Sequence, residues 1–219
     1  MKRSPLPVVV LISGRGSNLR ALIHSQQQQN PPNIEIRAVI SNRPDAAGLQ
    51  FAREQGVPTT VVDHTEFPDR ISYDHELIRE IDQHQPQLIV LAGFMRILSA
   101  DFVHHYHGRL LNIHPSLLPR FRGLDTHQQA LDTSAREHGA SVHYVTEELD
   151  GGPVLIQARV PVLDGDDADT LASRVLTEEH KLYPEAIRLI ADGRVKMVDD
   201  TLLFDQTPMN EPLELGNYS

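Results

Sequence analysis

The sequence predicts an α/β domain whose doubly wound, mostly parallel sheet is followed by a hairpin and a helix. Short apolar runs alternate with segments of helical periodicity, which is the order that parallel β-α-β units with right-handed crossovers require. Several of these apolar runs end directly in glycine or in polar side chains. Because ligands collect at the carboxyl ends of parallel strands, we expect the functional site at these ends.

The amino-terminal half has a Rossmann-like order of elements. The apolar run Leu6–Ile12 predicts a buried strand, and Leu19, Leu22 and Ile23 fall at helical spacing, so a helix should begin near Ser17. Further strands are expected over residues 34–40, 59–62, 88–92 and 110–113, with helices over residues 46–55 and 68–84. In the second of these helices, the residues expected to face the core are Ile71, Leu77, Ile78 and Ile81.

The carboxyl-terminal half predicts two strands, over residues 141–145 and 154–160, around a turn at Asp150. Helices are expected over residues 126–131 and 170–189. The aspartates among residues 164–169 lack calcium-loop spacing, and acidic charge is favourable where a helix begins, so we assign them to the start of the long helix.

The whole chain is expected to form a single domain over residues 1–205, with halves at about 6–105 and 106–205. Residues 206–219 contain Pro208, Pro212 and Gly216, and we expect them to form a flexible tail.

Composition excludes several classes of protein. The chain has no cysteine, which rules out disulfides, thiolate catalysis and cysteine zinc sites. A net charge of −10 argues against broad nucleic-acid binding. The apolar run that ends at Ile12 is too short for a signal peptide or a membrane helix, so we expect a cytoplasmic protein. No metal site is expected at His104, His105 and His107, because no Asp or Glu lies near them at the spacing of metal ligands.

A glycine-rich turn, Ser13-Gly14-Arg15-Gly16-Ser17-Asn18, links the first strand to the first helix. The exposed amides and the dipole of a helix start both favour a bound phosphate. The turn lacks the Gly-Lys-Ser/Thr ending of a Walker A loop, and Leu19 replaces the third glycine of a dinucleotide fingerprint. An anion site and a plain strand-to-helix turn therefore both remain open.

The most informative stretch is the strand end at Asn112 and His114, which Pro115 terminates. Residues i and i+2 of a strand point to the same side, so the two side chains should stand next to each other. An amide donor beside a group that carries protons near neutrality suits acyl transfer. Asp150 precedes Gly151-Gly152-Pro153, where the backbone can bend sharply, and a carboxylate near His114 would favour its imidazolium form. The alternative is a strand end with two polar residues facing water.

The run Asn112-Ile113-His114-Pro115-Ser116-Leu117-Leu118-Pro119, followed by Leu149-Asp150-Gly151-Gly152-Pro153, resembles the folate-dependent formyltransferases. The resemblance extends from about Val8 to about Met197. It implies transfer of the formyl group of 10-formyltetrahydrofolate, as co-substrate, to the amine of phosphoribosylglycinamide in purine synthesis. The partners implied are small molecules, with no nucleic acid and no membrane, and the protein is expected to be a monomer or homodimer without a metal.

The resemblance also implies roles for individual residues. Asn112, His114 and Asp150 would be catalytic. The substrate would be bound by Gly16, Ser17, Asn18 and Glu179. The formyl folate would be bound by Arg70, Met95, Arg96, Ile97, Leu98, Asn112, Thr146, Glu147, Glu148, Leu149 and Asp150. The alternatives to these binding roles are purely structural: surface positions for Arg70 and Glu179, and core positions for Ile97 and Leu98. Arg122 and Asp125 depart from the family pattern, which more often has proline and histidine there.

Three other functions stay open. A methionyl-tRNA formyltransferase shares the central motif but usually carries a further tRNA-binding domain, for which we expect no room here. A formyltetrahydrofolate deformylase usually bears an amino-terminal regulatory domain, whereas here the first strand begins at once. A nucleotide-binding protein without enzymatic activity would explain the glycine loop but not Asn112, His114 and Asp150.

Overall fold

The structure is a computed structural model that describes residues 4–218. It consists of two compact units, Met1–Leu111 (unit 1) and Asn112–Ser219 (unit 2), which are described separately. The expectation of a single domain over residues 1–205 stays a prediction.

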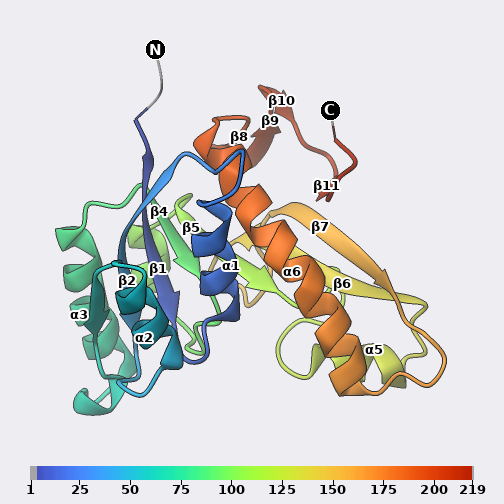
Figure 1. Cartoon of the computed structure of the whole chain (residues 1–219), viewed down its shortest axis with the longest axis horizontal. Coiled ribbons are helices and arrows are strands. Elements are labelled where there is room, and N and C mark those ends of the chain that lie inside the picture. Colours follow the sequence, from blue (N-terminus) through green and yellow to red (C-terminus); the bar gives the residue numbers. More distant parts are fainter. Residues whose placement is uncertain (1–3, 219) are drawn as a thin grey trace. The chain divides into compact units, whose positions relative to one another are not determined.

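Unit 1 contains parallel strands in the order β4-β1-β2-β3 (Figure 1). Val8, Val9, Val10, Leu11 and Ile12 of the central strand are fully buried, which explains why this run is continuously apolar. The strands are β1 (Leu6–Ile12), β2 (Ile34–Ser41), β3 (Thr59–Val61) and β4 (Leu88–Leu91). The helices are α1 (Ser17–Ser25), α2 (Ala47–Glu54), the 3-10 helix η1 (His64–Glu66), α3 (Arg70–Gln83) and α4 (Ala100–His105). The predicted strands and helices of this half are confirmed, with small differences at their ends.

Helix α3 buries Leu77 and Ile81 as expected, but it does not bury Ile71. Its fully buried residues Tyr73, Leu77 and Ile81 are spaced four apart, so they lie on one face of the helix. Ile71 precedes Tyr73 by two positions, which places it on the other side, and it is 53% exposed. The prediction that Ile71 faces the core was therefore wrong.

Unit 2 is built on an antiparallel hairpin of β6 (Glu137–Tyr144) and β7 (Val154–Pro161). The strand β5 (Leu110–His114) ends in this unit, next to β6. Helices α5 (Thr126–Asp132) and α6 (Ala168–Ala191) complete it, and α6 packs along β6 and β7 (Figure 1). The predicted hairpin and long helix are confirmed, although β6 begins at Glu137 rather than at Ser141.

The chain after α6 forms short strands that were not predicted. β8 (Val195–Val198), β9 (Thr201–Phe204) and β10 (Thr207–Pro208) make a small antiparallel sheet, and β11 (Leu213–Glu214) pairs with β7. The last two strands lie in the segment expected to be a flexible tail. They have few residues and no alternation to reveal them, and the mobility of this segment stays a prediction.

The acidic run before α6 has the role expected of it. Asp167 caps the helix by accepting hydrogen bonds from the amide and hydroxyl of Thr170. Asp166 pairs with Arg174, and hydrogen bonds from Arg174 hold the pKa of this carboxyl well below its usual range. Among residues 4–218 there is no cluster of three or more histidine and carboxylate side chains that could hold a metal ion.

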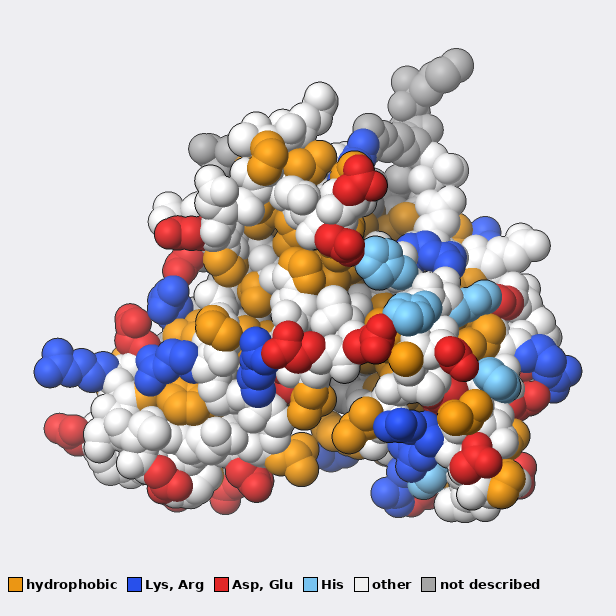
Figure 2. Space-filling view, turned by 180° about the vertical axis from the view of Figure 1, so that it is seen from behind, with side chains coloured by type: hydrophobic (Ala, Val, Ile, Leu, Met, Phe, Trp, Pro, Cys, Tyr) orange, Lys and Arg blue, Asp and Glu red, His pale blue; other side chains and the backbone are white. Residues whose placement is uncertain are grey.

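The surface carries charges of both signs. On the face drawn in Figure 2, acidic and basic side chains are interspersed. Over the described residues, no helix has the length and apolar character needed to cross a membrane.

Gly139 marks the closest approach of backbone within the hairpin. A Cβ atom at this position would lie 2.0 Å from the carbonyl oxygen of Ala158 and 2.9 Å from Cδ2 of Leu117. We expect Gly139→Ala to lower the free energy of unfolding by about 2 kcal/mol or more, because overpacking of this kind forces backbone shifts. Urea denaturation measures the effect. Gly14→Ala is the matched control, since a Cβ there meets no atom within 4 Å, and equal stability of the two variants would contradict the prediction.

Two histidines of unit 2 are buried without a charge. Burial lowers the pKa of both His138 and His143 to about 4. Between their unfolded pKa of 6.5 and this value, the unfolded chain binds protons that the folded chain does not. The free energy of unfolding should therefore be unaffected above pH 6.5 and should fall as the pH drops towards 4, by up to about 1.4 kcal/mol per pH unit for each histidine.

Urea denaturation between pH 7.5 and pH 5 tests this pH dependence. In His138→Asn, the free energy of unfolding should fall less steeply with decreasing pH, because one proton fewer is taken up on unfolding. His75→Asn should leave the slope unchanged, because the His75 side chain is 62% exposed. A stability that stays constant over this range would contradict the prediction.

Candidate active site

In unit 1, the glycine loop leads from β1 into α1 with the geometry of an anion site. Gly16 caps the helix with a φ of 69°, a left-handed conformation that glycine adopts without strain. The first amides of a helix have no partner within the helix ladder, and α1 begins at Ser17. They can therefore donate to an anion at the helix start.

Gly48 holds this loop in place, and sequence reasoning missed it. Its amide donates to the carbonyl oxygen of Gly14 at 3.0 Å. A Cβ at Gly48 would lie 2.6 Å from Ile12 Cδ1 and 3.3 Å from the Cα of Gly16. A glycine is thus needed where α2 approaches the loop. The available signal was a glycine in the first turn of a helix, where it lowers helix propensity.

A cavity of about 340 Å³ opens beside the loop, which is within the size range of small-molecule sites. Three arginines line it, Arg15, Arg43 and Arg96, and Arg43 also pairs with Asp45. Within the described residues, no carboxylate lines it. The cavity is therefore suited to an anion although the chain as a whole is acidic. Its lining residues are Ser13, Gly14, Arg15, Gly16, Ser17, Asn18, Asn42, Arg43, His64, Ala92, Gly93, Met95 and Arg96.

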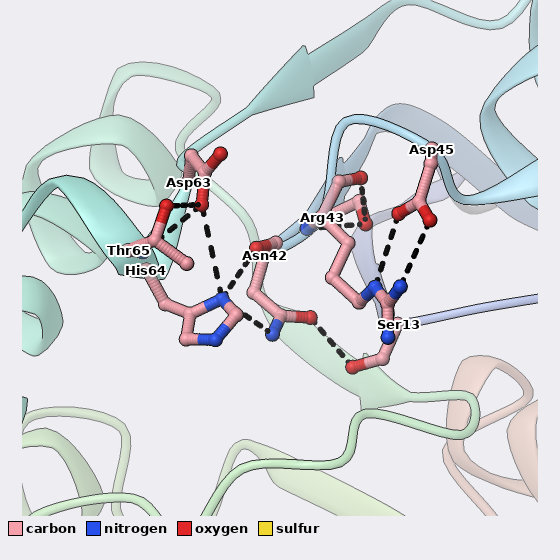
Figure 3. A network of polar contacts seen from close by, with 8 residues as sticks. Ser13, Asn42, Arg43, Asp45, Asp63, His64 and Thr65 are labelled. Atoms are coloured by element: carbon pink, nitrogen blue, oxygen red, sulfur yellow. Dashed lines mark hydrogen bonds and ion pairs between the residues drawn. The ribbon is translucent and has the colours of Figure 1, made fainter.

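A polar network joins the loops around this cavity (Figure 3). Ser13 Oγ donates to Asn42 Oδ1 at 2.6 Å and accepts from the amide of Met95 at 2.8 Å. Asn42 in turn contacts His64. The network links the ends of three strands to the Met95 segment. Sequence reasoning gave Ser13 no role beyond its place in the glycine-rich turn, and it missed Asn42 and His64 as site residues because neither belongs to a motif.

In unit 2, Asn112 and His114 project from the end of β5 towards Asp150 and His143. His114 is 6% exposed. Its Nδ1 lies 3.5 Å from Asp150 Oδ2, and Asn112 Nδ2 lies 3.1 Å from His143 Nε2. Asn112, His114 and Asp150 therefore lie in one cluster, as the sequence predicts. The catalytic roles stay predictions.

The loop after His114 is held by a buried network. Ser141 Oγ donates to the carbonyl oxygen of Ser116 at 2.6 Å and accepts from the amide of Leu118 at 3.0 Å. Gln157 Nε2 donates to the carbonyl oxygen of Leu118 at 2.9 Å and to Ser141 Oγ at 2.8 Å. The hairpin thus fixes the loop that follows the catalytic candidates.

Asp150 is placed by an unusual backbone and by one amide. Its φ of 48° is left-handed. The turn is tight, since a Cβ at Gly152 would lie 1.9 Å from the carbonyl oxygen of Tyr144. The amide of Gly123 donates to Asp150 Oδ2 at 2.9 Å. The carboxylate is consequently oriented before any ligand binds.

His143 determines which way the Asn112 amide points, and sequence reasoning missed it. Its Nδ1 lies 3.0 Å from the carbonyl oxygen of Tyr144, which can only accept, so Nδ1 carries the hydrogen. Because burial lowers the pKa of His143 to about 4, the ring is neutral and Nε2 is an acceptor. Asn112 must therefore turn its NH₂ group towards Nε2. One hydrogen of that group is used, and the second remains for a ligand.

Both ring nitrogens of His114 face acceptors. Nε2 lies 2.9 Å from the carbonyl oxygen of Phe121, and Nδ1 lies 3.5 Å from Asp150 Oδ2. An imidazolium, with a hydrogen on each nitrogen, satisfies both. The cluster can thus offer an amide donor and a proton donor side by side, which is what a developing oxyanion and a leaving nitrogen require.

The residues expected to bind folate lie in both units. In unit 1, Met95 and Ile97 are 73% and 66% exposed, so the alternative of a core position for Ile97 is wrong. Arg96 stacks over Tyr73 at 5.4 Å, and Arg70 is exposed at the start of α3. In unit 2, Glu147, Glu148 and Leu149 are exposed and Thr146 and Asp150 are half-buried.

Two further residues bear on the expectations. Glu179 on α6 is 8% exposed, so the alternative of a solvated helix carboxylate is wrong. Arg122, which departs from the family pattern, forms an ion pair with Glu148. Arg122, where the family pattern more often has proline, thus links the loop after His114 to the Asp150 turn by an ion pair. Asp125, the other departure, caps α5 with a φ of 54°.

Known proteins resemble this chain over most of its length. The phosphoribosylglycinamide formyltransferase of Escherichia coli (strain K12) is 54% identical over 198 residues, which are 90% of this chain and 93% of that protein. The trifunctional purine biosynthetic protein adenosine-3 of Homo sapiens is 45% identical over 190 residues, which are 87% of this chain and 19% of that longer protein.

A solved structure gives the same result for the fold. The phosphoribosylglycinamide formyltransferase from Coxiella burnetii matches with a TM-score of 0.91 and 48% identity, covering 96% of this chain and 99% of that one. This likeness confirms the predicted α/β fold. The family model described as formyl transferase matches residues 6–187. The extent of these matches shows that the chain belongs to the formyl transferase family.

Proposed function

We propose that this protein transfers the formyl group of 10-formyltetrahydrofolate to the primary amine of phosphoribosylglycinamide, giving formylglycinamide ribonucleotide and tetrahydrofolate in de novo purine synthesis. The observation that carries the proposal is the cluster of Asn112, buried His114 and Asp150 in a chain 54% identical to a phosphoribosylglycinamide formyltransferase. We expect small-molecule substrates, a cytoplasmic location and a monomer or homodimer.

The reaction needs no enzyme nucleophile. The amine attacks the formyl carbon, a tetrahedral intermediate forms, and the bond to the folate nitrogen breaks. The amine loses one proton and the leaving nitrogen gains one. Asn112 donates its second amide hydrogen to the developing oxyanion, while the other stays on His143 Nε2. His114 stabilises the same charge as imidazolium and protonates the leaving nitrogen. Asp150 balances the charge of His114 and, with ordered water, relays the proton that the amine loses back to this histidine.

The remaining assignments follow the same reaction. The amides of Gly16, Ser17 and Asn18 hold the phosphate of the acceptor. Glu179 contacts its ribose. Folate binds through Arg70, residues 95–98 and residues 146–150, where exposed Met95, Ile97 and Leu149 offer apolar contact to a flat ring system.

Other formyl-group enzymes differ in their acceptor, and the cavity in unit 1 favours one of them. Water is the acceptor in a formyltetrahydrofolate deformylase and needs no anion site. Initiator Met-tRNA is a polyanion, and a chain with a net charge of −10 is poorly suited to it. A small phosphorylated amine fits a cavity of about 340 Å³ with arginines and no carboxylate in its described lining.

A formyl-transfer assay with three acceptors tests the function directly. With 10-formyltetrahydrofolate as donor, we expect rapid turnover with phosphoribosylglycinamide and only background turnover with initiator Met-tRNA or water. Release of formate without formylation of any amine would instead identify a deformylase. Preferred formylation of the tRNA would instead identify a methionyl-tRNA formyltransferase.

The central residues should control the chemical step. Asn112→Ala and His114→Ala should each lower kcat by about 100- to 1,000-fold, because each removes a donor to the developing charge. Far-UV circular dichroism and urea denaturation should show that both variants fold. His75→Ala, a surface histidine of unit 1 whose side chain is 62% exposed, should keep full activity. Turnover near that of the unmodified enzyme in either central variant would refute the mechanism.

The glycine loop should determine how tightly the phosphate of the acceptor is bound. Ser17→Asp places a negative charge at the helix start, where it repels a bound phosphate. We expect the KM for phosphoribosylglycinamide to rise at least about 10-fold, as befits a lost charge-assisted contact, with little change in the KM for folate. Steady-state kinetics with each substrate varied in turn measures both values. Equal increases in the two constants would remove the phosphate from this loop.

A further inference from the structure

Asn42 and His64 line the cavity that contains the glycine loop, and Figure 3 shows the two side chains turned towards each other. Asn42 follows β2 and is 2% exposed, and His64 opens η1 with a side chain that is 28% exposed. The His64 ring also makes an edge contact with Tyr73, with centroids 6.4 Å apart. Both side chains are therefore held in fixed orientations.

The contacts of His64 define its hydrogen positions. Nδ1 lies 2.8 Å from the carbonyl oxygen of Asn42, which can only accept, so Nδ1 carries a hydrogen. Asp63 Oδ1 lies 3.9 Å from the same nitrogen and is itself held by the amide of Thr65. Nε2 makes no hydrogen bond within the described part of the chain. In Figure 3 this nitrogen lies on the side of the ring turned away from Asp63.

The Asn42 amide is oriented by its other neighbour. Its Oδ1 accepts from Ser13 Oγ at 2.6 Å, which turns Nδ2 towards His64. Nδ2 lies 3.3 Å from His64 Nδ1, but both atoms carry hydrogens, so this contact is not a hydrogen bond. Within the described part of the chain, the NH₂ group of Asn42, a lining residue that is 2% exposed, is thus left without an acceptor. Such a group is costly unless a ligand or water satisfies it.

The charge of the cavity points to an anionic occupant. Arg15 and Arg96 line it with Asn42 and His64, and no carboxylate among residues 4–218 does so. Among the described residues, the acid that approaches His64 is Asp63, which lies near Nδ1 and thus away from Nε2. A phosphate oxygen could accept from Asn42 Nδ2 and from a protonated Nε2 at the same time.

We propose that Asn42 and His64 form a second donor set for the phosphate of the acceptor, in the same cavity as the amides of Gly16, Ser17 and Asn18. This inference rests on the proposed function, because that function supplies the phosphate. His64 binds as imidazolium, with Nδ1–H on the Asn42 carbonyl and Nε2–H on the phosphate. Asn42 and His64 are thereby specificity-determining residues for a phosphorylated amine.

A pair of substitutions separates the two nitrogens of His64. Asn places an amide where Nδ1 stood, so His64→Asn keeps a donor for the Asn42 carbonyl but removes Nε2, the proposed donor to the phosphate. Gln reaches the position of Nε2, so His64→Gln keeps a donor there. We expect His64→Asn to raise the KM for phosphoribosylglycinamide and the inhibition constant of inorganic phosphate by about 10-fold each, and His64→Gln to restore both in large part. The KM for 10-formyltetrahydrofolate and kcat should change little.

Two further variants complete the experiment. His75→Asn makes the same chemical change on the exposed surface of α3 and should alter neither constant. Asn42→Asp replaces the NH₂ group by an anion of the same shape and should raise both phosphate-side constants more than His64→Asn does. Unchanged constants in His64→Asn, with formyl transfer intact, overturn this inference and leave the proposed function standing. Absence of formyl transfer in the unmodified enzyme refutes the proposed function instead.

Discussion

The proposed chemistry depends on one carboxylate that stands between two histidines of unequal charge. Asp150 places Oδ2 3.5 Å from His114 Nδ1 and Oδ1 3.7 Å from His143 Nε2. Burial lowers the pKa of His143 to about 4, and its Nε2 already accepts from Asn112, so this histidine offers the carboxylate no proton. His114 is thus left as the histidine that can balance the charge of Asp150. The neutral histidine holds the amide of Asn112, which is the proposed donor to the oxyanion.

The position of that carboxylate is in turn a property of the hairpin. Asp150 lies in the turn between β6 and β7 with a left-handed φ of 48°, and the turn passes so close to the Tyr144 carbonyl that only glycine fits at position 152. The same hairpin supplies Ser141 and Gln157, whose hydrogen bonds hold the loop after His114. One pair of antiparallel strands therefore fixes both sides of the proposed catalytic group, because its register sets the turn and the buried polar residues together.

The two asparagines that contact histidines illustrate how a hydrogen position decides what a site can bind. Asn112 meets the bare Nε2 of His143, because the Tyr144 carbonyl holds the hydrogen on the other nitrogen. Asn42 meets the protonated Nδ1 of His64, because its own carbonyl accepts that hydrogen. The first contact is a hydrogen bond that leaves one amide hydrogen for the substrate. In the second contact both nitrogens carry hydrogens, so no hydrogen bond forms. The Asn42 NH₂ group and His64 Nε2 are then the proposed donors to an anion.

Local patterns in the sequence were sufficient for the strand-turn-helix of the glycine loop, for the place of Asn112 and His114 at the end of a strand and for the sharp turn at Asp150. Each depends on residues only a few positions apart, where strand and helix periodicity and glycine conformation act directly. The sequence could not identify His143, His64 or Gly48. Asn112 and His143 are 31 residues apart and Asn42 and His64 are 22 apart, so their contacts depend on which strands become neighbours and in which register. Periodicity determines which side of a strand is buried. Only the tertiary structure determines what that side meets, how deeply a histidine is buried and therefore which of its nitrogens carries the proton.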